Sequence, residues 1–151
     1  MNPLFQKLNL KDQSEILVLN APESFEPELA ALEGVSIQED LSEIGAIAFA
    51  LAFVTTQQEV DTLAQAIAAK ARVDAVIWFA YPKGTSKKYK CDFNRDTGWQ
   101  VLGELGFEGV RQVAIDADWS ALRFRRVEFI KTMSRNPKRA ISAQGKKKVT
   151  D

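Results

Sequence analysis

Three strand-length runs of mostly apolar residues constrain the fold of this chain most strongly. They span residues 14–20, 44–54 and 73–81, and each ends in residues that favour a turn. Strands that are buried on both faces of a parallel sheet have nearly continuous apolar sequences of this kind. We therefore predict that these runs form the centre of a mostly parallel sheet with helices on both faces.

The segments between the apolar runs have helical periodicity. Residues 56–71 give the clearest pattern, because Thr56 and Glu59 have capping-box spacing and apolar side chains recur every three or four residues. Two weaker helices are predicted, one from Pro27 to Gly34 and one over residues 94–105 with Asn94 as its cap.

The end of the domain predicts an antiparallel hairpin. Residues 110–116 and 120–127 have strand character and are separated by about three residues, whereas a parallel return needs a dozen or more. With a short edge strand at residues 35–39, the predicted order is β-α-β-β-α-β-α-β-β. The fold class is α/β, a Rossmann-like and mostly parallel sheet of about six strands that ends in an antiparallel hairpin. It resembles a reduced class I methyltransferase fold, in which the last strand inserts antiparallel beside its neighbour.

Length and composition fit one globular domain followed by a tail. The chain has 151 residues, of which 46% are hydrophobic. We assign residues 1–130 to a single α/β domain and residues 131–151, where apolar residues become sparse, to a basic and disordered tail. No apolar run approaches the ~20 residues that cross a bilayer, the N-terminus lacks a signal-peptide pattern, and the lone cysteine fits a reducing compartment. A cytoplasmic protein without a membrane contact is expected.

The chain contains no histidine. Histidine is the commonest general base and the commonest ligand of transition metals, so its absence excludes Ser-His and Cys-His nucleophile pairs within one chain. No matched acid–base pair takes its place. We predict no catalytic residue and no metal site, and the balance leans away from an enzyme.

Candidate ligand-binding residues lie where three strands of the predicted sheet end, because ligands of open α/β sheets bind outside the carboxyl ends of the strands. In chain order, these corners are residues 20–23, 54–56 and 81–86. At the third corner, Lys83 would hold an anion, Gly84 would allow close backbone approach, and Thr85 or Ser86 would donate a hydroxyl. The alternative is a strand end with solvated lysines, since no P-loop spacing is present. The candidate pocket comprises Asn20, Pro22, Thr55, Pro82, Lys83, Gly84 and Ser86.

The first corner argues against a nucleotide cofactor. Its sequence, NAPESF, has no glycine to let the backbone embrace a phosphate, and Glu23 and Glu26 would repel one. No cofactor is predicted, and a neutral or cationic small molecule, or no ligand, fits this corner better.

Two further features have a possible chemistry and a simpler explanation. Cys91 lies among lysines that would lower the pKa of its thiol, although a lone loop cysteine is more often incidental. Asp116 and Asp118 flank the predicted hairpin turn, where aspartates shape turns more often than they bind metals.

The net charge of zero hides a strong asymmetry. Residues 23–43 carry seven acids and no base, whereas residues 123–151 carry ten bases and two acids. The plain explanation is a solvated acidic face and a solubilising tail. The alternatives are an anionic partner for the tail, such as nucleic acid, and a homodimer in which residues 23–43 face basic residues of a second copy.

Three sequence blocks resemble a known family. They are ILVLNAPESF at 16–25, WFAYPKGTS at 78–86 and DADWSALRFRR at 116–126, with PLFQKLNLK at 3–11 as a lead-in. They resemble a family of small bacterial proteins of unknown function with VLGAPEGF-like, W-x-x-(W/Y)-P-K and D-x-x-W-S-A-L-R motifs. Asn20 stands where that family usually has glycine, and the basic tail is an addition. The resemblance marks Pro22, Pro82, Lys83, Asp116, Trp119, Ser120 and Arg123 as motif positions, and it implies no activity.

Three functions follow as hypotheses. The first is a non-catalytic α/β domain that acts through protein contacts or a weakly held ligand. The second is a methyltransferase-like or other small-molecule-binding enzyme, with its pocket at the carboxyl ends of the central strands. The third is a nucleic-acid contact made by the basic tail.

Overall fold

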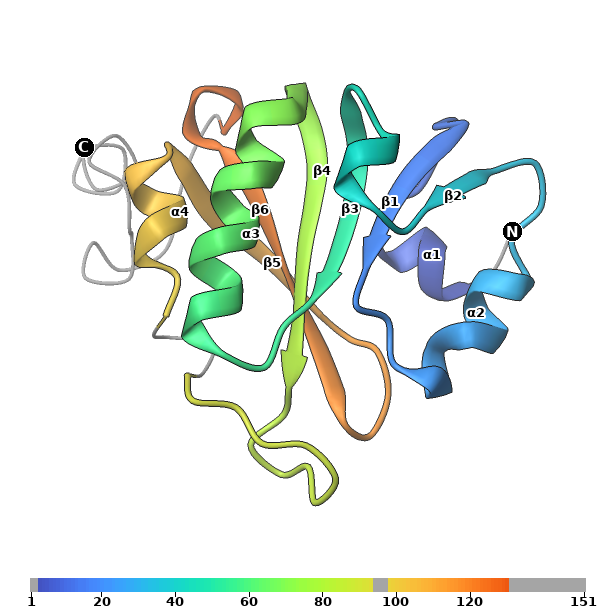
Figure 1. Cartoon of the computed structure of the whole chain (residues 1–151), viewed down its shortest axis with the longest axis vertical. Helices are drawn as coiled ribbons and strands as arrows, with labels where there is room; N and C mark the ends of the chain where they lie inside the picture. The colour runs from blue at the N-terminus through green and yellow to red at the C-terminus, as the bar shows by residue number, and fades with distance from the viewer. Residues whose placement is uncertain (1–2, 94–97, 131–151) are drawn as a thin grey trace.

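The computed structural model describes residues 3–93 and 98–130, and one six-stranded sheet forms its centre (Figure 1). Its order is β2-β1-β3-β4-β6-β5, in which neighbouring strands among β1 to β4 are parallel and β6 runs antiparallel to both β4 and β5. The predicted Rossmann-like sheet with a terminal antiparallel hairpin is therefore confirmed. The strands are β1 (Glu15–Leu19), β2 (Ser36–Gln38), β3 (Ile47–Phe53), β4 (Ala71–Pro82), β5 (Phe107–Ala114) and β6 (Trp119–Arg126).

Helices cover both faces of the sheet and create two apolar cores (Figure 1). Helices α1 (Pro3–Lys7) and α2 (Glu26–Ala30) bury Phe5 and Leu29 against one face, where Trp78 of β4 is fully buried. Helices α3 (Gln57–Lys70) and α4 (Gln100–Glu104) cover the other face. These strands carry apolar side chains on both faces of the sheet, so helices must pack on both faces to bury them.

The helix prediction was accurate for α3 and incomplete elsewhere. Thr56 Oγ1 accepts a hydrogen bond from the Glu59 backbone N–H at 3.1 Å, and Glu59 Oε1 accepts one from Thr56 N–H at 3.2 Å, which confirms the capping box. Helix α1 was missed because five residues are too few to show a period. The third predicted helix starts only at Gln100, because Gly98 has a φ of +90°, which a helix cannot include. Its proposed cap, Asn94, lies outside the described residues.

Asp116 shapes the hairpin turn, as the simpler of the two explanations for this residue predicted. Asp116 Oδ1 accepts hydrogen bonds from the N–H groups of Asp118 and Trp119, both at 2.8 Å. The Trp119 ring then packs edge-on against Phe53 of β3 with a centroid distance of 5.1 Å. In the described part of the chain, no three histidine, cysteine or acidic side chains gather closely enough to hold a metal.

Among the described residues, no helix is both long and apolar enough to cross a membrane. The predictions for residues 131–151 lie outside the described residues, so the proposed partner of the basic tail stays a prediction.

Candidate functional site

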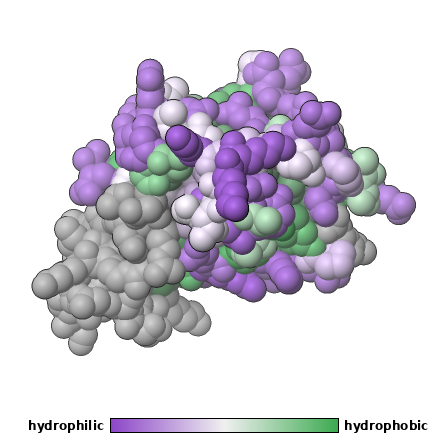
Figure 2. Space-filling view, turned by 90° about the horizontal axis from the view of Figure 1, so that it is seen from below, coloured by the Kyte–Doolittle hydropathy of each residue, from purple (hydrophilic) through white to green (hydrophobic). Residues whose placement is uncertain are grey.

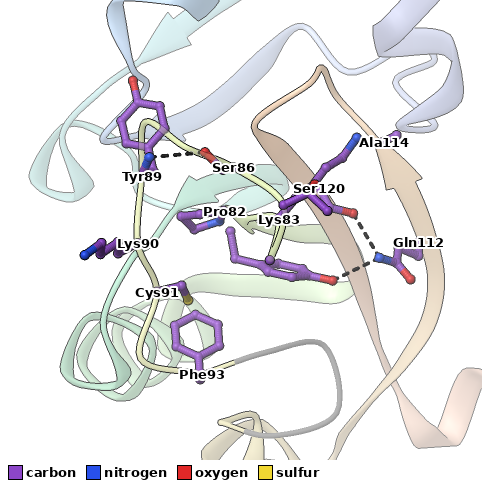
Figure 3. A pocket seen from close by; sticks show the side chains of 13 residues that line it. Pro82, Lys83, Ser86, Tyr89, Lys90, Cys91, Phe93, Gln112, Ala114 and Ser120 are labelled. Atoms are coloured by element: carbon purple, nitrogen blue, oxygen red, sulfur yellow. Dashed lines mark hydrogen bonds between the residues drawn. The ribbon is translucent and has the colours of Figure 1, made fainter.

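A cavity of about 910 Å³ lies at the carboxyl end of β4, and we call it the β4 cavity. The segment of residues 83–93 forms one wall, and the β5–β6 hairpin forms the other (Figure 3). Seen from below, the molecule is mostly hydrophilic on this side, with small apolar patches between (Figure 2). The lining consists of Tyr81, Pro82, Lys83, Gly84, Thr85, Ser86, Tyr89, Lys90, Cys91, Phe93, Gln112, Ala114 and Ser120.

Hydrogen bonds fasten the loop wall at both ends. Near β4, Lys83 N–H donates to the Asp118 carbonyl oxygen and Ser86 Oγ donates to Asp118 Oδ1, both at 2.8 Å. At the far end, Asp92 Oδ1 accepts a hydrogen bond of 2.7 Å from the backbone N–H of Gln57, in the first turn of α3. Contacts within the protein therefore hold the loop wall of the β4 cavity in place before any ligand binds.

A cluster of polar side chains lies at the hairpin side of the cavity. Gln112 Nε2 donates to Tyr81 Oη at 3.0 Å and to Ser120 Oγ at 2.9 Å (Figure 3). Tyr81 and Ser120 are register partners on β4 and β6, and each is only 4% exposed. Gln112 of β5 lies on the same face because it pairs with Leu122, two residues from Ser120. The hairpin register therefore assembles a polar group beside buried aromatic surface.

The remaining walls are cationic and aromatic. Lys83 and Lys90 line the cavity, and no acidic side chain does within residues 3–93 and 98–130. Phe93 packs edge-on against Trp99 at 5.0 Å and lies 6.1 Å from the Tyr81 ring, so two aromatic side chains of the lining are fixed by the core. Apolar walls with a few directed polar groups are the usual composition of a small-molecule site.

Cys91 does not have the activated thiol that its lysine neighbours suggested. Burial raises the pKa of the Cys91 thiol above its ordinary value, and the carboxylates of Asp92 and Glu59 raise it further. The backbone N–H of Phe93 acts in the opposite direction and does not compensate. The predicted lowering was wrong because the side chain is half-buried, and burial disfavours the charged thiolate.

The predicted pocket residues divide into two groups. Pro82, Lys83, Gly84 and Ser86 line the β4 cavity, as does the motif residue Ser120. Asn20, Pro22 and Thr55 do not line it, because they follow β1 and β3, which lie farther along the same edge of the sheet.

The first corner has a backbone that its sequence did not suggest. Asn20 adopts a φ of +59°, the left-handed conformation for which glycine is usually chosen, and its Nδ2 donates to the Phe53 carbonyl oxygen at 3.4 Å. Asparagine tolerates this conformation better than most residues. Asn20 therefore adopts the backbone conformation that glycine usually provides, although this corner contains no glycine. Beside it, Thr55 Oγ1 donates to Glu59 Oε1 at 3.1 Å, so this hydroxyl supports the capping box.

The other motif residues shape the hairpin. Asp116 forms the turn, and Trp119 packs between Phe53 and Tyr89, with centroid distances of 5.1 and 4.9 Å. Arg123 is half-buried opposite Arg111, and burial lowers the pKa of its guanidinium.

Sequence reasoning missed Tyr89, Lys90, Phe93 and Gln112. The first three lie on an irregular loop that carries no periodic signal. Gln112 carried a usable signal, because a turn closed by Asp116 fixes which β5 residues share a face with Ser120.

Comparisons with protein-family models and with curated proteins yield no match to this chain. Solved structures do share its fold. NodS, an N-methyltransferase from Bradyrhizobium japonicum WM9, has a TM-score of 0.52 and 12% identity, covering 83% of this chain and 93% of its own. The magnesium protoporphyrin IX methyltransferase ChlM from Synechocystis PCC 6803, with bound SAM, has a TM-score of 0.50 and 12% identity, covering 82% and 74%. Fibrillarin from Methanococcus jannaschii, a pre-rRNA processing protein, has a TM-score of 0.50 and 12% identity over 77% and 67%. At this identity the similarities show a class I methyltransferase-like fold and nothing beyond it.

Proposed function

We propose that this chain is a small-molecule-binding protein built on a methyltransferase-like sheet, with its ligand in the β4 cavity. One observation carries the proposal: at the carboxyl end of β4, buried hydroxyls, two lysines and fixed aromatic rings line a single cavity. Ligands of open α/β sheets bind at this edge. A volume of about 910 Å³ also lies within the range of roughly 300–1,000 Å³ that such sites have.

The first corner supports a second candidate ligand, S-adenosylmethionine. Asn20 has the backbone conformation of a glycine turn, and ChlM, which has this fold, is described with bound SAM. The methyl donor carries a sulfonium cation and no phosphate, so Glu23, which would repel a nucleotide phosphate, does not oppose it. In this version the β4 cavity holds a second molecule beside the methyl donor.

Non-catalytic action remains part of the proposal. No histidine and no activated thiol is available to the β4 cavity, so binding without chemistry is the simpler role.

Membership of the bacterial family of unknown function and a cytoplasmic setting are also proposals. A homodimer through the acidic residues 23–43 is another, and sedimentation at two salt concentrations tests it.

A thermal-shift screen tests the proposed function. The full chain is melted with S-adenosylmethionine, S-adenosylhomocysteine, nucleotides, and small acids and their neutral analogues. A ligand present at 100 times its dissociation constant stabilises the folded state by ~2.7 kcal/mol, which is easily measured. The variant Lys83→Ala removes a lining residue, and Lys87→Ala is its matched control, because Lys87 is exposed on the same loop and does not line the cavity. A flat screen contradicts the proposal.

A further inference from the structure

We infer that the β4 cavity takes a small anion with a flat apolar body, and that Lys83 and the buried Ser120 hydroxyl hold its charged group. The inference rests on the proposed function, because it requires the β4 cavity to be a binding site. It adds the chemical class of the ligand, which the fold alone does not give.

The charge of the lining selects an anion. Among the described residues, the lining has two ammonium groups, those of Lys83 and Lys90, and no carboxylate. Within the described residues, neither ammonium makes a salt bridge or a hydrogen bond. The nearest acid along this wall, Asp118, accepts the hydrogen bond of Ser86 and is not part of the lining. Unpaired charges of one sign beside low-dielectric walls raise the local concentration of a counter-ion.

Ser120 supplies a directed donor where a ligand could reach it. Its Oγ is an acceptor for Gln112 Nε2, so the hydroxyl hydrogen points elsewhere, and no described residue accepts a hydrogen bond from it. Ser120 is buried, and a buried hydroxyl without an acceptor is costly unless a ligand or water accepts from it. With the Gln112 amide turned over, the unused donor is its NH₂ group, so the cavity keeps a donor in either orientation.

Lys83 lies beside this donor. Its backbone N–H donates to the carbonyl oxygen of Asp118, two residues before Ser120 in the chain, and Lys83 and Ser120 line the β4 cavity next to each other (Figure 3). Lys90 lies on the opposite wall, away from Gln112 (Figure 3). One ammonium and one hydroxyl therefore make the anion subsite, while Lys90 adds to the field from across the cavity.

The rings select the body of the ligand. Tyr81 and Phe93 are held by the core, and Tyr89 is held against Trp119 at 4.9 Å. Fixed aromatic surfaces pack best against a flat apolar group. A phosphate monoester and a carboxylate both offer the required oxygens, so the shared chemistry is an anionic group on a ring.

Calorimetric titration of the full chain tests the inference. The probes are phenyl phosphate, benzoate, benzyl alcohol as the neutral analogue, and inorganic phosphate. We expect at least one ring-bearing anion to bind, with affinity that falls as salt rises, and we expect benzyl alcohol to bind at least tenfold more weakly. The ratio of phenyl phosphate to benzoate affinity identifies the preferred anion, and inorganic phosphate tests the need for a ring.

Variants locate the subsite. Lys83→Ala and Ser120→Ala are each expected to lower the affinity about tenfold, Lys90→Ala less, and Lys87→Ala not at all. Thermal melting establishes that each variant is folded, and Ser120→Thr, which keeps the hydroxyl, is expected to retain more affinity than Ser120→Ala.

The outcomes separate this inference from the proposed function. If benzyl alcohol binds as tightly as the anions, the inference is overturned and the proposed function stands. The same holds if Lys83→Ala and Ser120→Ala leave the affinity for the anions unchanged. Failure of both ring-bearing anions to bind at millimolar concentration also overturns the inference. Only a flat result in the wider ligand screen removes the proposed function itself.

Discussion

Ser86 Oγ donates a hydrogen bond to Asp118 Oδ1 at 2.8 Å, and this contact joins the loop after β4 to the turn of the β5–β6 hairpin, 32 residues away in sequence. The same hydroxyl accepts the N–H of Tyr89 at 3.1 Å. One serine thus shapes the loop and attaches it to the opposite wall of the β4 cavity. Its hydroxyl is therefore a structural group of the cavity, although Ser86 lies in the lining.

Removing this hydroxyl should loosen the cavity wall. Ser86→Ala is expected to lower the free energy of unfolding by about 1 kcal/mol and to speed amide exchange in residues 84–90. Thr85→Ala is the matched control, because Thr85 is exposed and its hydroxyl makes no hydrogen bond among the described residues. Equal exchange rates in the two variants would show that the Ser86–Asp118 contact does not hold the loop.

The backbone of Asn20 gives a second prediction. Asn20→Gly and Asn20→Ala both remove the long hydrogen bond to the Phe53 carbonyl, but only alanine is strained at a φ of +59°. We expect Asn20→Ala to be less stable than Asn20→Gly by about 1 kcal/mol in urea denaturation. Equal stability of the two variants would contradict the left-handed turn.

The sheet could be predicted from sequence because its evidence is local. The three apolar runs have strand length, and the hairpin follows from a connection too short for any other topology. The turn conformation of Asn20 was not predicted, because a missing glycine indicates an ordinary backbone, whereas asparagine tolerates a positive φ better than most residues.

Part of the site was missed for a different reason. Lys83 and Gly84 directly follow a strand, so a topological rule finds them. Gln112 and Tyr81 meet only through the pairing of β6 with both β4 and β5, which is a long-range relationship. Phe93 reaches the cavity through an irregular loop whose path is set by Asp92 and α3.

The ion pair between Asp74 and Arg125 predicts a pH dependence of stability. Arg125 donates from Nε and Nη2 at 2.9 and 2.8 Å, and these bonds lower the pKa of Asp74 from its ordinary 3.8. Because the folded-state pKa is the lower one, the contribution is complete above the ordinary pKa and is lost as pH falls through the folded-state value. Its size is less than about 1 kcal/mol, since both side chains are more than a third exposed.

Urea midpoints of the wild-type protein and Asp74→Asn between pH 7 and pH 2 test this pair. The difference between the two proteins should be constant above about pH 5 and should shrink below the ordinary pKa of 3.8. A difference that grows on acidification would have the wrong sign for a lowered pKa.

The Cys91 thiol should react slowly in the folded protein. Because burial raises the pKa of this thiol, alkylation by iodoacetamide at pH 7 is expected to be slower than in the urea-unfolded chain, which serves as the control. A ligand in the β4 cavity should slow the reaction further, since Cys91 lines it. Folded protein reacting as fast as the unfolded chain would contradict the half-buried placement.

The most direct test of the β4 cavity as a binding site is a backbone amide NMR titration of the ¹⁵N-labelled full chain with phenyl phosphate and, separately, with S-adenosylmethionine. With phenyl phosphate, we predict saturable shifts concentrated in residues 81–93, Gln112 and Ser120, which line or adjoin the β4 cavity. Phenyl phosphate shifts confined to Asn20 and Thr55, or no saturable shift with either compound, would contradict it.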